Sequence, residues 1–206
     1  MAILKQLSMV GAFAAMAAPV LAQENISAAA PQASGNVIEM SQALDCHTND
    51  GYAPNVMAMS SDGLNNVFGV RFGNADYTDD YGYRTVLDAT HLPQASHLLQ
   101  SFVVEHECAH HSLGHTYEAY DNGFVPTDRF WSYEDDADCA ALRAISRKYG
   151  YSGDETLTAL FAEMESVNFD IIRSLSIEAE EMADLLNELP DRMEAREQRA
   201  QMCPIF

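Results

Sequence analysis

The stretch VVEHECAHHSLGH, residues 103–115, holds four of the seven histidines of this 206-residue chain, with Glu107 among them. Its apolar residues lie around most of a helical wheel, which predicts a largely buried helix. On that helix His106 and His110 lie about 40° apart, one turn above the other, with Glu107 on the same side. Buried imidazoles and carboxylates are costly without partners. HExxH is the spacing with which one helix offers two histidine nitrogens to Zn²⁺, so the segment predicts a zinc site.

A zinc site of this kind needs a third ligand, and the sequence offers two candidates. His115 lies about 140° from His110 on the wheel, so only a helix break at Gly114 would bring it round. Glu134 follows His110 by 24 residues, and Asp138 lies one turn later on the same expected helix. One carboxylate can bind the metal while the other accepts the N–H of a ligating imidazole. Two alternatives remain, a hydrogen-bonded histidine pair without metal and an ordinary solvated helix start.

Periodicity divides the rest of the chain into a strand-rich part and a helical part. Alternating runs predict strands at 36–40, 55–59, 66–72 and 83–89, separated by segments rich in Asn, Asp and Gly. Helical periodicity predicts helices at 96–113, 132–149, 153–166, 169–187 and 191–202, the first two capped by Ser96 and Ser132. We therefore expect an α+β fold, with a small N-terminal, mostly antiparallel sheet followed by a helical half.

The N-terminus has the pattern of a secretory signal peptide. Residues 1–22 carry one lysine, no acid and a long apolar run, and they end in Val20-Leu21-Ala22. This predicts cleavage between Ala22 and Gln23. An uncleaved anchor helix is the alternative, but the apolar core is short for a membrane span. We expect an exported chain, periplasmic or secreted, without a membrane span after cleavage.

Charge and composition limit the remaining possibilities. The net charge is −20, and removal of residues 1–22 with their one lysine would change it to −21. Such an acidic chain argues against nucleic acids and anionic membranes as partners. Residues 23–35 are rich in Ala, Ser, Gln and Pro, which predicts a flexible lead-in. Residues 36–206 have the length of a single domain.

The four cysteines, an even number in a chain expected to be exported, predict two disulfides. Three pairings are open. We favour Cys108–Cys139 with Cys46–Cys203, because the first bond would join the two helices that share the metal. Free buried cysteines are one alternative, and a Cys46 thiolate that binds the zinc in a latent form is another.

The two metal-binding segments together resemble the gluzincin metallopeptidases, whose signature is HExxH followed by a helix with ExxAD. Here the signature reads His106-Glu107-Cys108-Ala109-His110 and Glu134-Asp135-Asp136-Ala137-Asp138. The stretches FVVEHECAHHSLGH and EDDADCAALRA look similar to the small bacterial exported zinc peptidases called minigluzincins. The resemblance covers residues 98–147, and segment 61–82 has no counterpart. The metzincin pattern does not fit, since Leu113 and Thr116 stand where it requires Gly and His.

The resemblance implies a zincin-like fold and a role for each residue of the motif. His106, His110 and Glu134 would be the zinc ligands, and Asp138 would orient a ligating histidine. Glu107 would be the general base that takes a proton from the attacking water. The expected activity is hydrolysis of peptide bonds in a peptide or protein substrate.

Several assignments stay open beside this expectation. A second donor to the oxyanion is available from Tyr149, Tyr151, Arg192 or Arg196. The four other histidines, His47, His91, His97 and His111, are interpreted as surface or packing residues. The alternative functions are a zinc-binding protein of the same fold without turnover, and an acidic interaction module.

Overall fold

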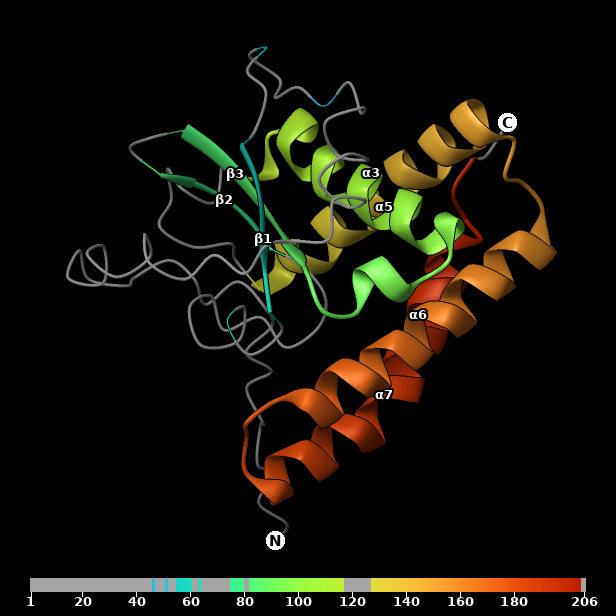
Figure 1. Cartoon of the computed structure of the whole chain (residues 1–206). Coiled ribbons are helices and arrows are strands. Elements are labelled where there is room, and N and C mark those ends of the chain that lie inside the picture. The colour runs from blue at the N-terminus through green and yellow to red at the C-terminus, as the bar shows by residue number, and fades with distance from the viewer. Residues whose placement is uncertain are drawn as a thin grey trace, which may run out of the picture.

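The computed structural model describes residues 55–60, 75–79, 82–116 and 127–204, together with Cys46, Gly51 and Gly63. Within these ranges the chain is mostly helical and contains one small sheet (Figure 1). The strands are β1 (Asn55–Met59), β2 (Ala75–Asp79) and β3 (Gly82–Asp88). A short 3₁₀ helix, η4 (Leu92–Gln94), precedes the helices α3 (His97–Leu113), α5 (Thr127–Tyr149), α6 (Asp154–Ser174) and α7 (Ala179–Ala200). The predicted signal peptide, the lead-in 23–35 and the predicted strands 36–40 and 66–72 lie outside the described residues.

The sheet has the strand order β1-β3-β2. Strand β1 is parallel to β3, whereas β2 is antiparallel to it, so the expectation of a mostly antiparallel sheet is wrong for one of the two pairs. The central strand β3 is buried, with Val86 and Leu87 inaccessible to solvent, as the middle strand of a covered sheet should be. The predicted strands 55–59 and 83–89 are confirmed as β1 and β3.

Strand β2 was missed in the sequence. Its residues ADYTD lie in a segment rich in Asp, Asn and Gly, residue types that are depleted in strands. Asp79 nevertheless pairs with Gly82 across a connection of two residues. Pairing with the neighbouring strand therefore overrides the local preference of the segment.

Helix α3 has the two ends that the sequence predicts. The Ser96 hydroxyl accepts a hydrogen bond from the Leu99 amide at 3.2 Å, which caps the first turn. Gly114 ends the helix with φ of 82°, a left-handed conformation that glycine adopts without strain. Ser96 also bonds to Glu163 of α6, so the start of α3 is tied to the helical half.

The later helices are longer and fewer than predicted. Helix α5 begins at Thr127, before the expected cap at Ser132, and it ends before Gly150 as predicted. The three helices expected between 153 and 202 are instead two helices, α6 and α7, which residues 175–178 connect. Met164 and Ile172 of α6 share one buried cluster with Leu189 of α7. Because this packing is continuous, both helices extend across the positions where we expected breaks.

Helix α3 lies between the sheet and the other helices (Figure 1). A large apolar cluster joins α3, α5, α6 and α7, and Phe102 of α3 meets Phe161 of α6 within it. A smaller cluster of Leu87, Leu92 and Val104 joins α3 to β3 and η4. Both faces of α3 are therefore covered, which explains why its polar side chains are buried. None of the helices in the described ranges is long and apolar enough to cross a membrane.

All four cysteines form disulfides, but not in the favoured pairing. Cys46 is bonded to Cys108, with Cα atoms 5.6 Å apart, and Cys139 is bonded to Cys203, with Cα atoms 5.3 Å apart. Cys108 lies on the back of α3 relative to His106, at about 200° on the wheel. Helix α5 packs on the histidine side, so Cys139 cannot reach it. Two disulfides are typical of an oxidising compartment outside the cytosol.

Candidate metal centre

Two histidines of α3 face each other through their Nε2 atoms. His106 and His110 lie one turn apart, and their Nε2 atoms are 3.1 Å from each other. The side chains are 8% and 2% exposed, so both imidazoles have left bulk water. Residues four apart lie on one face of a helix, and burial of that face directs both rings toward α5.

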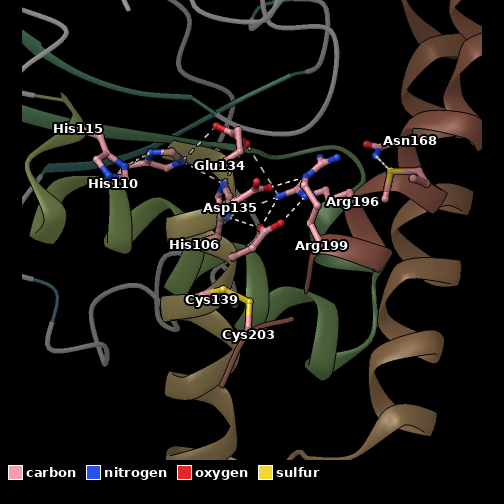
Figure 2. Close-up of polar contacts among 12 residues, drawn as sticks. His106, His110, His115, Glu134, Asp135, Cys139, Asn168, Arg196, Arg199 and Cys203 are labelled. Carbon is pink, nitrogen blue, oxygen red and sulfur yellow. Dashed lines mark hydrogen bonds and ion pairs between the residues drawn. A yellow bond between two sulfur atoms is a disulfide. The ribbon is translucent and has the colours of Figure 1, made fainter. Parts of the chain in front are cut away.

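Helix α5 places a carboxylate opposite both nitrogens. Glu134 Oε2 lies 3.5 Å from His106 Nε2, and Glu134 Oε1 lies 3.4 Å from His110 Nε2. Figure 2 shows Glu134 facing the two imidazoles. One donor atom from each residue lies within 4.8 Å of the others, so these three side chains could hold a metal ion. Glu134 is 17% exposed, more than either histidine.

The distances between the donor atoms fit a small tetrahedral ion. Two nitrogens that are each 2.0–2.1 Å from a tetrahedral zinc lie about 3.3 Å apart. The observed separations of 3.1 Å between the nitrogens and 3.4–3.5 Å from nitrogen to oxygen match this spacing. The donor atoms therefore need only a small adjustment to take an ion between them.

Behind His106 lies a chain of charged groups. Asp138 Oδ1 is 2.8 Å from His106 Nδ1, the nitrogen that points away from Glu134. Arg196 of α7 donates two hydrogen bonds to Asp138, from Nη2 at 2.6 Å and from Nε at 2.7 Å. A bidentate pair of this kind fixes both orientation and charge. His106 can then donate its Nδ1–H to Asp138 while Nε2 keeps its lone pair for a metal.

Electrostatics at this cluster favour positive charge. Burial alone would lower the pKa of His106, but its hydrogen bonds with Asp138 and Glu134 raise that pKa to about 10. Burial would raise the pKa of Glu134, yet its contact with His106 and the charges around it lower that pKa to about 2. Arg196 holds the pKa of Asp138 well below its ordinary value, against the effect of burial. Both carboxylates are thus ionised at neutral pH and attract a cation.

Glu107, the predicted base, lies on α3 between the two histidines in sequence and is buried. Its charge helps to raise the pKa of Arg196, together with the larger contributions of Asp138 and Glu134 and against burial. Glu107 is therefore close enough to this cluster to take part in its electrostatics.

Behind His110 lies a second imidazole, that of His115. His110 Nδ1 is 3.1 Å from His115 Nδ1, on the opposite side of the ring from the metal-facing nitrogen. The His115 ring stacks on Tyr133, with centroids 4.2 Å apart and planes 8° from parallel. The break at Gly114 does bring His115 back toward α3, but it places the ring behind His110 and outside the metal-binding group.

The other histidines in the described ranges have structural contacts. His111 is buried, with Nε2 2.9 Å from the Thr85 hydroxyl of β3 and Nδ1 3.3 Å from the Thr116 hydroxyl. His91 contacts Asp88 at 3.1 Å, and His97 is exposed beside two tyrosines. These contacts agree with packing and surface roles, and His47 lies outside the described residues.

The candidates for a second donor occupy different places. Tyr149 and Tyr151 contact His97 at the start of α3, far along the helix from His110. Arg192 pairs with Glu188 on its own helix. Only Arg196 belongs to the cluster, with Nη2 4.0 Å from Glu134 Oε2. Its position as the partner of Asp138 could not be read from the sequence, because the two residues lie 58 positions apart.

Comparison with known proteins found no match to this chain among protein-family models, curated proteins or solved structures.

Proposed function

We propose that this protein is a zinc-dependent peptidase of the gluzincin type. The observation that carries the proposal is the convergence of two histidine nitrogens and one carboxylate from two helices, with a further buried glutamate beside them. Three protein ligands and one open position characterise catalytic zinc sites, whereas structural sites have four protein ligands. The zincin-like fold and export from the cytosol are parts of the same proposal.

The donor set favours zinc over the other common ions. Magnesium and calcium prefer oxygen ligands, while two imidazoles and a carboxylate suit a borderline ion such as zinc. His106 and His110 would bind the ion through Nε2, and Glu134 would complete the set. Asp138, held by Arg196, keeps the Nδ1 proton of His106 and thereby orients its ring.

The remaining chemistry belongs to Glu107. Zinc in such a site polarises a carbonyl and lowers the pKa of water to about 7. Glu107 accepts the proton of the attacking water and returns it to the leaving amine when the peptide bond breaks. Arg196 is held by Asp138 and Glu134, so its part is to fix the carboxylates.

Elemental analysis and site substitutions test the metal site and the catalytic base together. Purified protein should contain one zinc ion, and Glu134→Ala should lose it. Asp136→Ala is the matched control, because Asp136 is exposed on the same helix and should leave the zinc in place. Zinc that binds with unchanged affinity after Glu134→Ala would contradict this ligand set.

Glu107→Gln then separates catalysis from metal binding. The variant keeps the size of the side chain but loses the base, so zinc should remain while cleavage of a peptide library falls by about 10²–10⁴. Glu105→Gln is the control for loss of a buried carboxylate on α3, since Glu105 pairs with Lys148 at 2.6 Å. Equal cleavage by Glu107→Gln and the parent rules out the mechanism. A parent that binds zinc but cleaves nothing favours a zinc-binding protein without turnover.

A further inference from the structure

A metal at the site would determine which of His110 and His115 donates the hydrogen bond between them. His110 Nε2 faces His106 and Glu134, so a metal would take the lone pair of this nitrogen. A neutral imidazole that offers Nε2 carries its proton on Nδ1. His110 Nδ1 must therefore donate to its neighbour at 3.1 Å, which is His115 Nδ1. His115 is then the acceptor, with its own proton on Nε2.

The fold holds the His115 ring in the position that this role requires. Gly114, with φ of 82°, turns the chain at the end of α3 and returns His115 to the side of His110. The ring is 8% exposed and lies parallel to the ring of Tyr133 at 4.2 Å. Tyr133 directly precedes Glu134 on α5. The helix that supplies the third metal-binding side chain thus also fixes the acceptor behind the second.

We propose that His115 is a positioning residue for metal binding, which sets the tautomer and the ring orientation of His110. The inference rests on the metal site of the proposed function. A carboxylate or a backbone carbonyl commonly supports a metal-binding histidine, and here an imidazole takes that place. Asp138 has this role for His106, so the two metal-binding histidines are oriented by different chemistry.

Substitutions of His115 that separate ring stacking from hydrogen bonding test this role. His115→Phe keeps an aromatic ring for Tyr133 but loses the acceptor. His115→Asn loses the ring but can place an amide oxygen near the position of Nδ1. We expect zinc affinity, measured by competition with a chelator, to fall about 10–100-fold in His115→Phe. Most of this loss should be recovered in His115→Asn, and His97→Phe, an exposed histidine on α3, should bind zinc like the parent.

Cobalt binding gives a second measurement that a purely structural role would not change. The visible spectrum of bound Co²⁺ depends on the geometry of its ligands. It should change in His115→Phe and return toward that of the parent in His115→Asn. Circular dichroism and thermal unfolding of the metal-free proteins establish that each variant is folded.

The outcomes separate this inference from the proposed function. Unchanged zinc affinity in folded His115→Phe, with zinc lost in Glu134→Ala, overturns the role of His115 and leaves the metal site standing. A parent that binds no zinc overturns both. If His115→Phe does not fold, His115→Asn is compared with His115→Gln, whose amide reaches the Nε2 position instead. Equal zinc affinity of these two variants contradicts the inference, and weaker binding by His115→Gln supports it.

Discussion

The two histidines of the candidate site are both buried and lie one turn apart on α3, but their surroundings differ. His106 is supported by full charges, since Asp138 contacts it and Arg196 of α7 holds Asp138. His110 is supported by rings, since His115 contacts it and Tyr133 stacks on His115. The charged support connects three helices, whereas His115 follows His110 by only five residues. The support of His106 thus depends on the assembly of three helices. The support of His110 depends largely on a local turn.

This difference predicts where the site is vulnerable. A buried ion pair is strongly destabilising when one partner is removed, because the other charge loses its compensation. The contact between His110 and His115 is not an ion pair, so its disruption should affect geometry more than stability. We therefore expect changes at the His106 end to alter both folding and metal binding. Changes at the His110 end should alter mainly metal binding.

The largest effect is expected for Asp138→Asn. The change removes the charge that Arg196 contacts most closely and leaves it with Glu134 at 4.0 Å, so the free energy of unfolding should fall by about 3 kcal/mol, the lower part of the range for a broken buried pair. Zinc affinity should fall as well, because a neutral amide supports the Nδ1 proton of His106 less strongly than the charged carboxylate does. Urea denaturation and zinc competition measure the two effects.

Asp135→Asn is the matched control for that change. Asp135 pairs with Arg199 at 2.7 Å, but the two side chains are 32% and 29% exposed. We expect a loss of about 1 kcal/mol or less and no change in zinc affinity. A similar stability loss in both variants would mean that burial does not distinguish the two pairs.

The pH dependence of the metal-free protein tests the charged end directly. The pKa of His106 is raised to about 10 from 6.5, so its contribution to stability is complete below about pH 6.5 and is lost as the pH rises toward 10. Between pH 7 and pH 8 the contribution of His106 to the free energy of unfolding should fall by about 1.2 kcal/mol. The pKa of Glu134 is lowered to about 2 from 4.5, so its contribution is complete above about pH 4.5 and is lost as the pH falls toward 2.

Urea denaturation with chelator present, from pH 3 to pH 10, gives this profile. The maximum from these groups should lie between about pH 4.5 and 6.5. In His106→Gln the decrease above pH 7 should disappear, and the decrease in acid should become smaller because the contact with His106 helps to lower the pKa of Glu134. A parent profile that is flat from pH 6 to pH 9 would show that His106 is not held by these carboxylates.

A small effect, similar to that of Asp135→Asn, is expected at His111, the neighbour of His110. Thr85→Val removes the hydroxyl that contacts His111 Nε2, which should cost about 1 kcal/mol of stability. Zinc affinity should not change, because His111 lies outside the metal-binding group. A weaker zinc site in this variant would show that the anchor of α3 on the sheet also positions His110.

The sequence predicted the residues of the site better than their connections. His106, His110, Glu134 and Asp138 were recognisable because helical spacing is a local property of the chain. The structure brings all four together. Arg196 was one of four candidates for an oxyanion donor, and its pairing with Asp138 was not predicted, because no periodicity relates residues on separate helices.

One wrong prediction and one open question show the limits of local patterns. The helical wheel assigns Cys108 to the back of α3, but it does not reveal which segment covers that back, and the favoured disulfides were therefore wrong. The wheel also placed His115 away from His110, because it assumes that the helix continues past Gly114. A left-handed residue at that position changes the direction of the chain, which no wheel can represent.

The order of the disulfides along the chain has a consequence for biosynthesis. The bonds join the first cysteine to the second and the third to the fourth, with separations of 62 and 64 residues. A chain that enters an oxidising compartment from its N-terminus can therefore form each bond as soon as the next cysteine arrives. The native pairs then require no exchange between earlier and later bonds. If the chain is exported with its N-terminus first, as proposed, its maturation should need an oxidant but no disulfide isomerase.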